Sequence, residues 1–340
     1  MLLDFTEKGI YCAQAGVYID PWKPVDKALI THGHADHSRW GHKHYLCTRQ
    51  AAPVIQHRLG KIDVAPVDFG ETLTIQGVKI SFHPAGHIIG SAQVRLEYKG
   101  EVWVVSGDYK LEDDGLTEPF EPVRCHTFIT ESTFGLPVYN WKPQQEVFKE
   151  INQWWRANKE EGKTTLLTGY ALGKAQRIIQ NLDETIGTIY THGAIENVNE
   201  VIRGQGIALK STVRVTQDIS KELYPGSIVI ATPSSVGSSW IKKFAPFSIG
   251  SASGWMNLRG ARRRRSVDRG FVLSDHADWN GLNTAIEECG AERVFVTHGY
   301  TSVFSQWLNE KGIEAGQVET QFEGELVEIG ESAEKEEDPA

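Results

Sequence analysis

The first part of the chain, up to about residue 135, alternates short apolar runs with turn residues. The runs are rich in Val, Ile and Tyr, and Gly, Pro and Asp separate them, which is the pattern of buried and half-buried β-strands. The predicted strands are VYID (17–20), KALITH (27–32), VKISFHPAG (78–86), AQVRLEY (92–98), EVWVVSGD (101–108) and TFITES (127–132). This part of the chain is therefore predicted to build β-sheets.

The pattern changes at LPVYNWKP (136–143), which has two prolines and no periodicity. Apolar residues then recur at helical spacing through residues 144–162, and Gly162 ends this predicted amphipathic helix. Further along, strands are predicted at 164–169, 188–193 and 227–232, and helices at 173–184 and 194–206. Strands that alternate with helices in this way predict a parallel sheet with flanking helices.

The first pattern returns at residue 270. It predicts a strand FVLSDH (271–276), a helix GLNTAIEECG (281–290), a strand RVFVTHG (293–299), another helix and a last strand ELVEIG (325–330). We therefore predict an α/β protein in which one domain is formed by residues 1–135 and 270–330, with a second domain, residues 136–269, inserted into it. The acidic end, residues 331–340, is predicted to be a disordered tail.

The composition is that of an ordinary globular protein, which excludes a largely disordered or collagen-like chain. No apolar run reaches the ~18 residues of a membrane span, and the start of the chain lacks the pattern of a secretory signal. The four cysteines are scattered, so we expect free thiols in a reducing cytoplasm. The net charge of −9 argues against a protein that coats nucleic acid, although RGARRRRSVDR (259–269) is a local basic patch.

A dense group of metal-ligand side chains follows the apolar strand KALI. His32, His34, Asp36 and His37 form an H-x-H-x-D-H motif within six residues. Because alternate residues at a strand end point the same way, His32 and His34 are expected to lie together, whereas Asp36 and His37 can face a second ion. Imidazole with carboxylate suits zinc, with manganese or iron as the alternatives.

Two more ligand candidates lie where predicted strands end. His87 stands in the glycine-flanked turn HPAGHIIGSA, and Asp108 ends EVWVVSGD, where its carboxylate could bridge two ions about 3.5–4 Å apart. His83, four residues before His87, is left out of the predicted ligand set. Asp20 is a candidate hydrogen-bond acceptor behind a ligand imidazole, or else an ordinary turn residue before Pro21.

These residues resemble the motifs of the metallo-β-lactamase fold nucleases. The H-x-H-x-D-H group is similar to their second motif, His87 to the third, Asp108 to the fourth and Asp20 to the first. Beyond Asp108 the chain resembles the β-CASP branch, whose members cut nucleic acid. In that comparison Glu131 in ITESTFG is similar to motif A, His276 in LSDHADW to motif B and His298 in FVTHGY to motif C.

A longer resemblance, over most of residues 8–310, is to the bacterial ligase-associated DNA exonucleases. It is carried by YIDPWKPVDKALITHGHADH, HPAGHIIGSAQVRLEYKGEVWVVSGDYK, FEPVRCHTFITESTFGLPVYNW and YALGKAQRI. The resemblance implies an αββα metallo-β-lactamase sandwich with an inserted β-CASP domain and two divalent metal ions, with His298 completing the ligands of the second ion. It also implies DNA, single-stranded or with an end, as substrate, and a DNA ligase and a helicase as candidate partners.

The implied reaction is hydrolysis of a phosphodiester by metal-activated water, with Asp36, Glu131 and His276 as catalytic residues. His276 is the candidate general acid, oriented by Glu131 and supported by Asp278. Alternatively, His276 caps the helix that follows it, and Glu131 is an ordinary carboxylate at a strand end.

Contacts to nucleic acid are expected at three places. The run Arg262, Arg263, Arg264 and Arg265 could follow a phosphate backbone, or could simply be a solvated loop. Lys174, at a predicted helix start, could meet a phosphate, or the segment could be a plain turn between strand and helix. Ser132 and Thr133, directly after Glu131, complete the set.

The preferred function is a DNA exonuclease of DNA repair, and three alternatives stay open. An RNA-processing nuclease is favoured by His298, because RNA-cutting members of the resembled families usually carry histidine at motif C, whereas Artemis-like DNA nucleases carry valine. A small-molecule hydrolase of the same fold is the second alternative, but Asp108 and His298 are 190 positions apart, and such enzymes lack so long an insertion. A non-catalytic DNA-binding scaffold would not need every ligand in place.

Overall fold

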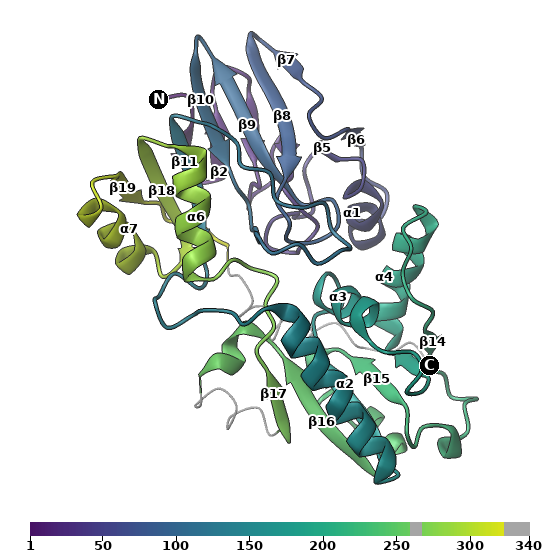
Figure 1. The fold of residues 1–340 in the computed structure, drawn as a ribbon. Helices are drawn as coiled ribbons and strands as arrows, with labels where there is room; N and C mark the ends of the chain where they lie inside the picture. The colour runs from purple at the N-terminus through teal and green to yellow at the C-terminus, as the bar shows by residue number, and fades with distance from the viewer. Residues whose placement is uncertain (259–266, 323–340) are drawn as a thin grey trace. The chain divides into compact units, whose positions relative to one another are not determined.

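A computed structural model describes residues 1–258 and 267–322 of the 340-residue chain (Figure 1). Among these residues the chain divides into two compact units. The first unit combines residues 1–140 with the segment that begins at His276, and the second runs from Trp141 to Asp275. The first unit has two sheets and the second has one, and each unit has its own hydrophobic core.

The first unit contains two sheets. The six-stranded sheet comprises β1 (Asp4–Thr6), β2 (Gly9–Cys12), β3 (Val17–Ile19), β4 (Lys27–Leu29), β5 (His44–Thr48) and β6 (Val64–Val67), in that order. The seven-stranded sheet has the order β19 (Glu314–Gln317), β18 (Arg293–Gly299), β11 (Thr127–Ser132), β10 (Glu101–Val105), β9 (Ala92–Tyr98), β8 (Val78–Pro84) and β7 (Leu73–Ile75). Its helices are α1 (Ala52–Leu59), α6 (Trp279–Cys289) and α7 (Thr301–Glu310).

Buried side chains stack these elements into four layers, α1, the six-stranded sheet, the seven-stranded sheet, and α6 with α7. Between the sheets, side chains such as Ile19 and Leu29 share one core with Phe82 and Trp103. The helix α1 packs on the outer face of the first sheet, and α6 and α7 cover the outer face of the second. A sheet buried on both faces needs apolar side chains on both, which explains why these strands read as nearly continuous apolar runs.

Strand direction brings the candidate residues of the second sheet to one edge. The strands β10, β11 and β18 are mutually parallel, and β8 points the same way because it and β10 are both antiparallel to β9. The ends of these strands therefore lie along the same side of the sheet. His87, Asp108, Glu131 and His298 all lie at or just beyond those ends.

The second unit contains a parallel six-stranded sheet. Its order is β14 (Val213–Arg214), β13 (Ile189–Thr191), β15 (Ile228–Ala231), β12 (Thr164–Thr168), β16 (Phe247–Ala252) and β17 (Arg269–Phe271), and every paired neighbour is parallel. Its helices are α2 (Gln144–Glu160), α3 (Lys174–Asn181) and α4 (Gly193–Gly204), with short 3₁₀ turns η1 (Lys221–Leu223), η2 (Pro233–Ser235), η3 (Ser239–Phe244) and η4 (Gly254–Asn257). The apolar faces of α2, α3 and α4 pack on one face of this sheet, and α2 is the amphipathic helix that the helical spacing over residues 144–162 predicted.

The structure differs from the sequence analysis at the end of the second unit. The sequence pattern assigns residues 270–275 to the first domain, because the strand pattern of the first part returns at residue 270 with FVLSDH. In the structure the strand is β17, Arg269–Phe271, which pairs with β16 in the parallel sheet, and residues 272–275 follow it without strand structure in the second unit. An apolar run of six residues gives no information about which sheet it joins. The predicted strand 325–330, the tail 331–340 and Arg262–Arg265 lie outside the described residues.

No helix among residues 1–258 and 267–322 combines the length and the apolar character that crossing a membrane requires. The four cysteines are buried, and no disulfide joins any two of them.

Candidate metal centre

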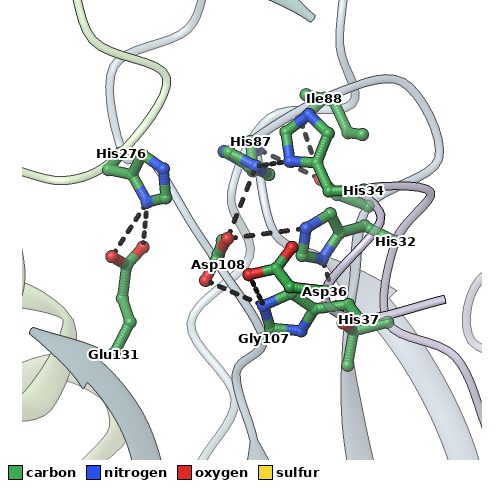
Figure 2. Close-up of polar contacts among 12 residues, drawn as sticks. His32, His34, Asp36, His37, His87, Ile88, Gly107, Asp108, Glu131 and His276 are labelled. Carbon is green, nitrogen blue, oxygen red and sulfur yellow. Dashed lines mark hydrogen bonds and ion pairs between the residues drawn. The ribbon is translucent and has the colours of Figure 1, made fainter. Parts of the chain in front are cut away.

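Asp108 lies at the centre of the candidate site, and its two carboxylate oxygens face different histidines (Figure 2). Oδ2 is 3.5 Å from Nε2 of His32 and 3.7 Å from Nε2 of His87. Oδ1 is 3.1 Å from Nε2 of His298 and 3.5 Å from Nε2 of His37. Asp108 is only 2% exposed, and burying an unpaired carboxylate would be costly. The surrounding ring nitrogens offset that cost.

The first group of possible ligands comprises His32, His34, His87 and Asp108, whose ligand atoms all lie within 4.8 Å of one another. Nδ1 of His34 is 3.0 Å from Nε2 of His87. In a tetrahedral zinc site with bonds of about 2.0–2.1 Å, neighbouring ligand atoms are about 3.3 Å apart. The separations of 3.0–3.7 Å in this group are of that size.

The second group comprises His37, Asp108 and His298, again within 4.8 Å of one another. Oδ2 of Asp36 lies 3.7 Å from Nε2 of His37, at the edge of this group. Asp108 therefore belongs to both groups, which is the position that a bridging carboxylate occupies between two ions.

In the second group, a hydrogen bond on the side of the His37 ring that faces away from Asp108 fixes the orientation of this ring. Nδ1 of His37 lies 2.8 Å from Oδ2 of Asp20, and since a carboxylate oxygen only accepts, Nδ1 carries the proton. Nε2 of His37 then faces Asp108. Asp20 is 1% exposed and has a positive φ of 42°, an uncommon conformation for a residue other than glycine.

Thr31 gives His32 the same kind of support. Its hydroxyl donates to Oδ2 of Asp20 at 2.5 Å and lies 3.0 Å from Nδ1 of His32. Because its proton is used on Asp20, the hydroxyl accepts from Nδ1 of His32, which leaves a lone pair on Nε2. Gly107, with a φ of 57°, lets the end of β10 approach here, since a Cβ at this position would lie 2.6 Å from the Thr31 hydroxyl.

The protonation of His32 shows that the donor set fits a cation. Burial, reinforced by the neighbouring imidazole of His37, lowers the pKa of His32 well below its ordinary value, so that this ring is neutral at pH 7. Its Nε2 and Oδ2 of Asp108 are then two acceptors 3.5 Å apart, and Nε2 has no hydrogen-bond partner among the described residues. Two buried acceptors face each other in this way when a cation lies between them, so the residues fit a metal ion.

The electrostatics of the second group also favour a cation. Burial alone would lower the pKa of His37, but the carboxylates of Asp108, Asp36 and Asp20 raise it to about 10. Burial would likewise raise the pKa of Asp108, yet His37 and His298 hold it well below its usual range. Asp108 is therefore ionised near neutral pH, and the negative potential that holds a proton at this place would equally hold a metal ion.

His276 and Glu131 form a buried pair beside Asp108 (Figure 2). Nδ1 of His276 lies 2.9 Å and 3.1 Å from the two oxygens of Glu131, and the three residues together form a third group within 4.8 Å. Oε1 of Glu131 also accepts from the N–H of Tyr109, at 2.9 Å. The carboxylate is therefore held in place, and the opposite ring nitrogen of His276 is directed away from it.

Other residues that the sequence singled out lie outside the three ligand groups. The carboxylate of Asp278 caps α6, accepting from the N–H of Gly281 at 2.8 Å. The hydroxyl of Ser132 donates to the C=O of His298 at 2.7 Å, whereas the hydroxyl of Thr133 is buried and has no hydrogen-bond partner among the described residues. His83 pairs with Glu121 and lies in none of the metal-ligand groups found among the described residues.

Lys174, in the second unit, is completely buried, with Nζ 3.5 Å from Oδ2 of Asp275 and 4.5 Å from the ring centre of Tyr170. Arg177 approaches the other oxygen of Asp275 at 3.4 Å and donates to the C=O of Ser274 at 2.8 Å. This packing is that of a buried ion pair, in which Lys174 and Arg177 hold Ser274 and Asp275 in the segment that follows β17.

The sequence analysis did not single out Thr31, Thr297 or Arg58. Both threonines directly precede a candidate ligand histidine, in THGH and VTHG, and that shared position was a signal. Arg58 donates from α1 to the C=O of Gly33 at 3.1 Å and to both oxygens of Ser38, and it thereby fixes the loop that carries the motif. Nothing in the sequence around Arg58 indicates this contact.

Comparison with known proteins gives relatives that act on nucleic acids. The chain is 31% identical over 311 residues to a probable DNA ligase of Opitutus terrae, a match covering 90% of this chain and 30% of that protein. It is 32% identical over 123 residues to the endoribonuclease YSH1 of Saccharomyces cerevisiae, covering 36% of this chain and 16% of that protein. It is also 27% identical over 202 residues to a ribonuclease of Thermus thermophilus, covering 51% of this chain and 44% of that protein. The chain thus spans less than half the length of each of these relatives.

No family model matches the chain. Among solved structures, it resembles the crystal structure of a protein of unknown function from Enterococcus faecalis, with a TM-score of 0.60 and 9% identity, over 86% of this chain and 78% of that one. The four layers of the first unit and the His/Asp cluster at the strand ends decide the architecture. The chain has the metallo-β-lactamase fold. In this metallo-β-lactamase fold the cluster is a buried donor set consistent with metal binding, and the predicted fold class is confirmed.

Proposed function

We propose that this protein is a metal-dependent nuclease of the β-CASP type that removes nucleotides from the end of a DNA strand. The observation that carries the proposal is the position of Asp108. Its oxygens face two separate sets of histidines, and the His276–Glu131 pair lies within 4.8 Å on another side. A bridging carboxylate next to an imidazole–carboxylate pair supports two-metal hydrolysis of a phosphodiester.

Two divalent ions held here, which we propose to be Zn²⁺ with Mn²⁺ as the alternative, would lower the pKa of water toward neutrality and neutralise charge on the phosphate. His32, His34, His87 and Asp108 would hold one ion, and Asp36, His37, Asp108 and His298 the other. Asp20, Thr31 and Thr297 keep the ring nitrogens of their histidines turned toward Asp108.

His276 would supply the proton that the leaving sugar oxygen needs. Its Nδ1 is engaged by Glu131, so the proton that it can donate stands on Nε2. A carboxylate partner favours the protonated imidazole, and that proton can pass to the sugar oxygen as the bond to phosphorus breaks. Glu131 fixes the ring so that this proton stays directed at the leaving oxygen.

The preference for DNA rests on the extent of the relationships. A relative named as a probable DNA ligase matches 90% of this chain, whereas the endoribonuclease of Saccharomyces cerevisiae matches 36%. A role in DNA repair beside a ligase and a helicase belongs to the same proposal. An RNA-processing nuclease is the second candidate, because His298 lies in the second ligand group and two of the relatives are ribonucleases.

Strand binding is proposed for Thr133 and for the arginine run. The Thr133 hydroxyl has no hydrogen-bond partner among the described residues, but it is buried, so a phosphate oxygen could accept its proton only if the side chains that cover it moved aside. For Arg262–Arg265 the proposal rests on the sequence alone. Lys174 is the weaker candidate, since its ammonium group is fully buried beside Asp275. Replacing the four arginines by alanine should flatten the salt dependence of binding to a single strand, by about 0.7 in log–log slope per lost phosphate contact.

The proposal is tested with linear and circular single-stranded DNA of the same sequence. The metal-loaded protein should shorten the linear strand and leave the circle intact, and chelation should stop cleavage until metal is restored. The Asp108→Asn protein, purified in the same way, is the control for contaminating nucleases. Rapid cutting of the circle would contradict the exonuclease part, and full activity in chelator would contradict the metal-dependent part.

A further inference from the structure

Trp40 is an exposed aromatic residue close to the metal-ligand motif. Its side chain is 73% exposed, and it is the only aromatic residue among the highly exposed large hydrophobic side chains of the described part of the chain. An indole has a large apolar surface whose burial is strongly favourable, so proteins usually cover it. No element of the described first unit covers Trp40, although the residues around it are well packed.

The turn that carries Trp40 is fixed from below. The buried hydroxyl of Tyr45 donates to the C=O of Arg39 at 2.9 Å and accepts from the N–H of His42 at 3.1 Å, so that one side chain ties both ends of the turn. Gly41 adopts a φ of 103° between them. The indole therefore projects from a backbone that is already ordered, and a ligand that stacks on it would not have to order the loop first.

The same turn is tied to the metal-ligand loop. Nε of Arg39 donates to the C=O of Asp36 at 3.3 Å, and Nη2 donates to the C=O of Gln321 at 2.9 Å. Trp40 follows the ligand His37 by three residues, so their Cα atoms are at most about 11 Å apart. The exposed ring is thus held within a few nucleotides' reach of the centre.

We propose that Trp40 is a stacking platform for a base of the bound strand. This inference rests on the proposed function, since only a nucleic-acid substrate supplies the ring. Every base has a flat π-face, so a stacked indole adds affinity without reading the sequence, as an exonuclease that moves along a strand requires. Phosphate contacts alone would let the strand shift along the site, and a stacked base near the centre holds one nucleotide in register.

The experiment measures binding of two single strands of equal length, one of oligothymidine and one made entirely of abasic nucleotides. The metal-loaded protein carries His276→Ala so that the strand is cut slowly. Trp40→Ala should weaken binding of oligothymidine by about 5- to 100-fold, with no change in binding of the abasic strand. Trp40→Phe should restore most of the affinity. Val303→Ala, which removes an exposed side chain on α7 of the same unit, is the matched control and should change neither affinity.

Three outcomes overturn the stacking role and leave the proposed function intact. Either Trp40→Ala binds oligothymidine as tightly as its parent, or it loses affinity equally for the abasic strand. Loss of binding to a purified DNA ligase, with DNA binding unchanged, would also overturn it and would make Trp40 a protein contact. If the parent protein binds neither DNA nor RNA, the proposed function fails together with this inference.

Discussion

The hydroxyl of Thr297 lies 3.2 Å from Nδ1 of His298 and donates its own proton to the C=O of Thr130 at 3.0 Å. Since a carbonyl oxygen only accepts, the hydroxyl has a lone pair left for Nδ1, which must then carry the proton. The lone pair of His298 is thereby placed on Nε2, 3.1 Å from Asp108. Thr297 thus selects the tautomer that can bind a metal ion.

Thr297→Val should therefore weaken the binding of one of the two ions. Valine keeps the shape of threonine but removes the acceptor, so that His298 can place its proton on Nε2. Loss of a hydrogen bond behind a ligand typically costs about 10- to 100-fold in metal affinity. Competition with a chelator should show that one ion is bound more weakly and the other with unchanged affinity. Thr297→Ser should restore the affinity for the first ion. Equal affinities in the valine variant would remove Thr297 from the account.

Asp108→Asn should release both ions, because the carboxylate is shared by the two ligand groups. The amide has nearly the same size but no charge, so the buried histidines lose the anion that balances two cations. Elemental analysis of the purified proteins measures this directly. Asp278→Asn is the matched control and should keep both ions, since Asn caps a helix as well as Asp does. An Asp108→Asn protein that still holds two ions would exclude the bridging role.

His276→Ala should retain its metals and bind DNA, yet cleave more slowly by about 10²–10⁴-fold. A nitrophenyl phosphodiester, whose leaving group does not need a proton, should lose far less. The ratio of the two rates separates proton donation from phosphate positioning. His83→Ala, which removes a histidine paired with Glu121, should leave both rates near those of the parent. Equal losses on the two substrates would reassign His276 to positioning.

The stability of the first unit should fall in mild acid because of His42. Burial lowers the pKa of His42 to about 4, from an ordinary value of 6.5. The ring is neutral in both states above pH 6.5, whereas below it the unfolded chain takes up a proton that the folded chain resists. Folding therefore loses free energy as the pH falls from 6.5 to 4, by up to about 3 kcal/mol.

His42→Asn tests this effect, because the amide oxygen can still accept from the N–H of Val25, as Nδ1 of His42 does at 3.3 Å. Urea unfolding at pH 7 and pH 4.5 should show a smaller loss of stability in the variant than in the parent. If both proteins lose the same amount, another group causes the acid sensitivity.

The sequence predicted the elements of the core well, since burial on both faces leaves a clear apolar pattern. Predicted strands at 92–98, 101–108 and 127–132 correspond to β9, β10 and β11, and the helix predicted at 144–162 is α2, Gln144–Glu160. The pattern could not decide which sheet takes β17, because strand pairing depends on tertiary packing and not on the run itself. The inserted domain 136–269 stays a prediction as an independent folding unit.

The buried His/Asp cluster was predictable because its residues are few, chemically specific and placed at strand ends. Their supports were less so. The contacts of Thr31 and Thr297 depend on which way a hydroxyl points, and Arg58 reaches the ligand loop from a helix that begins fifteen residues after His37. Periodicity records burial and not such contacts. Lys174 shows the reverse case, because a lysine at a helix start suggested a phosphate contact, whereas the structure buries it beside Asp275.

The central claim is cleavage of DNA from an end, and matched strands of DNA and RNA test it most directly. Single strands of equal sequence, labelled at one end, are incubated with the protein loaded in turn with zinc or manganese, and the products are separated by length. The account predicts a ladder of products that differ by one nucleotide, formed faster from DNA than from RNA with either metal. A large preference for RNA with both metals would contradict it and establish the RNA-processing alternative.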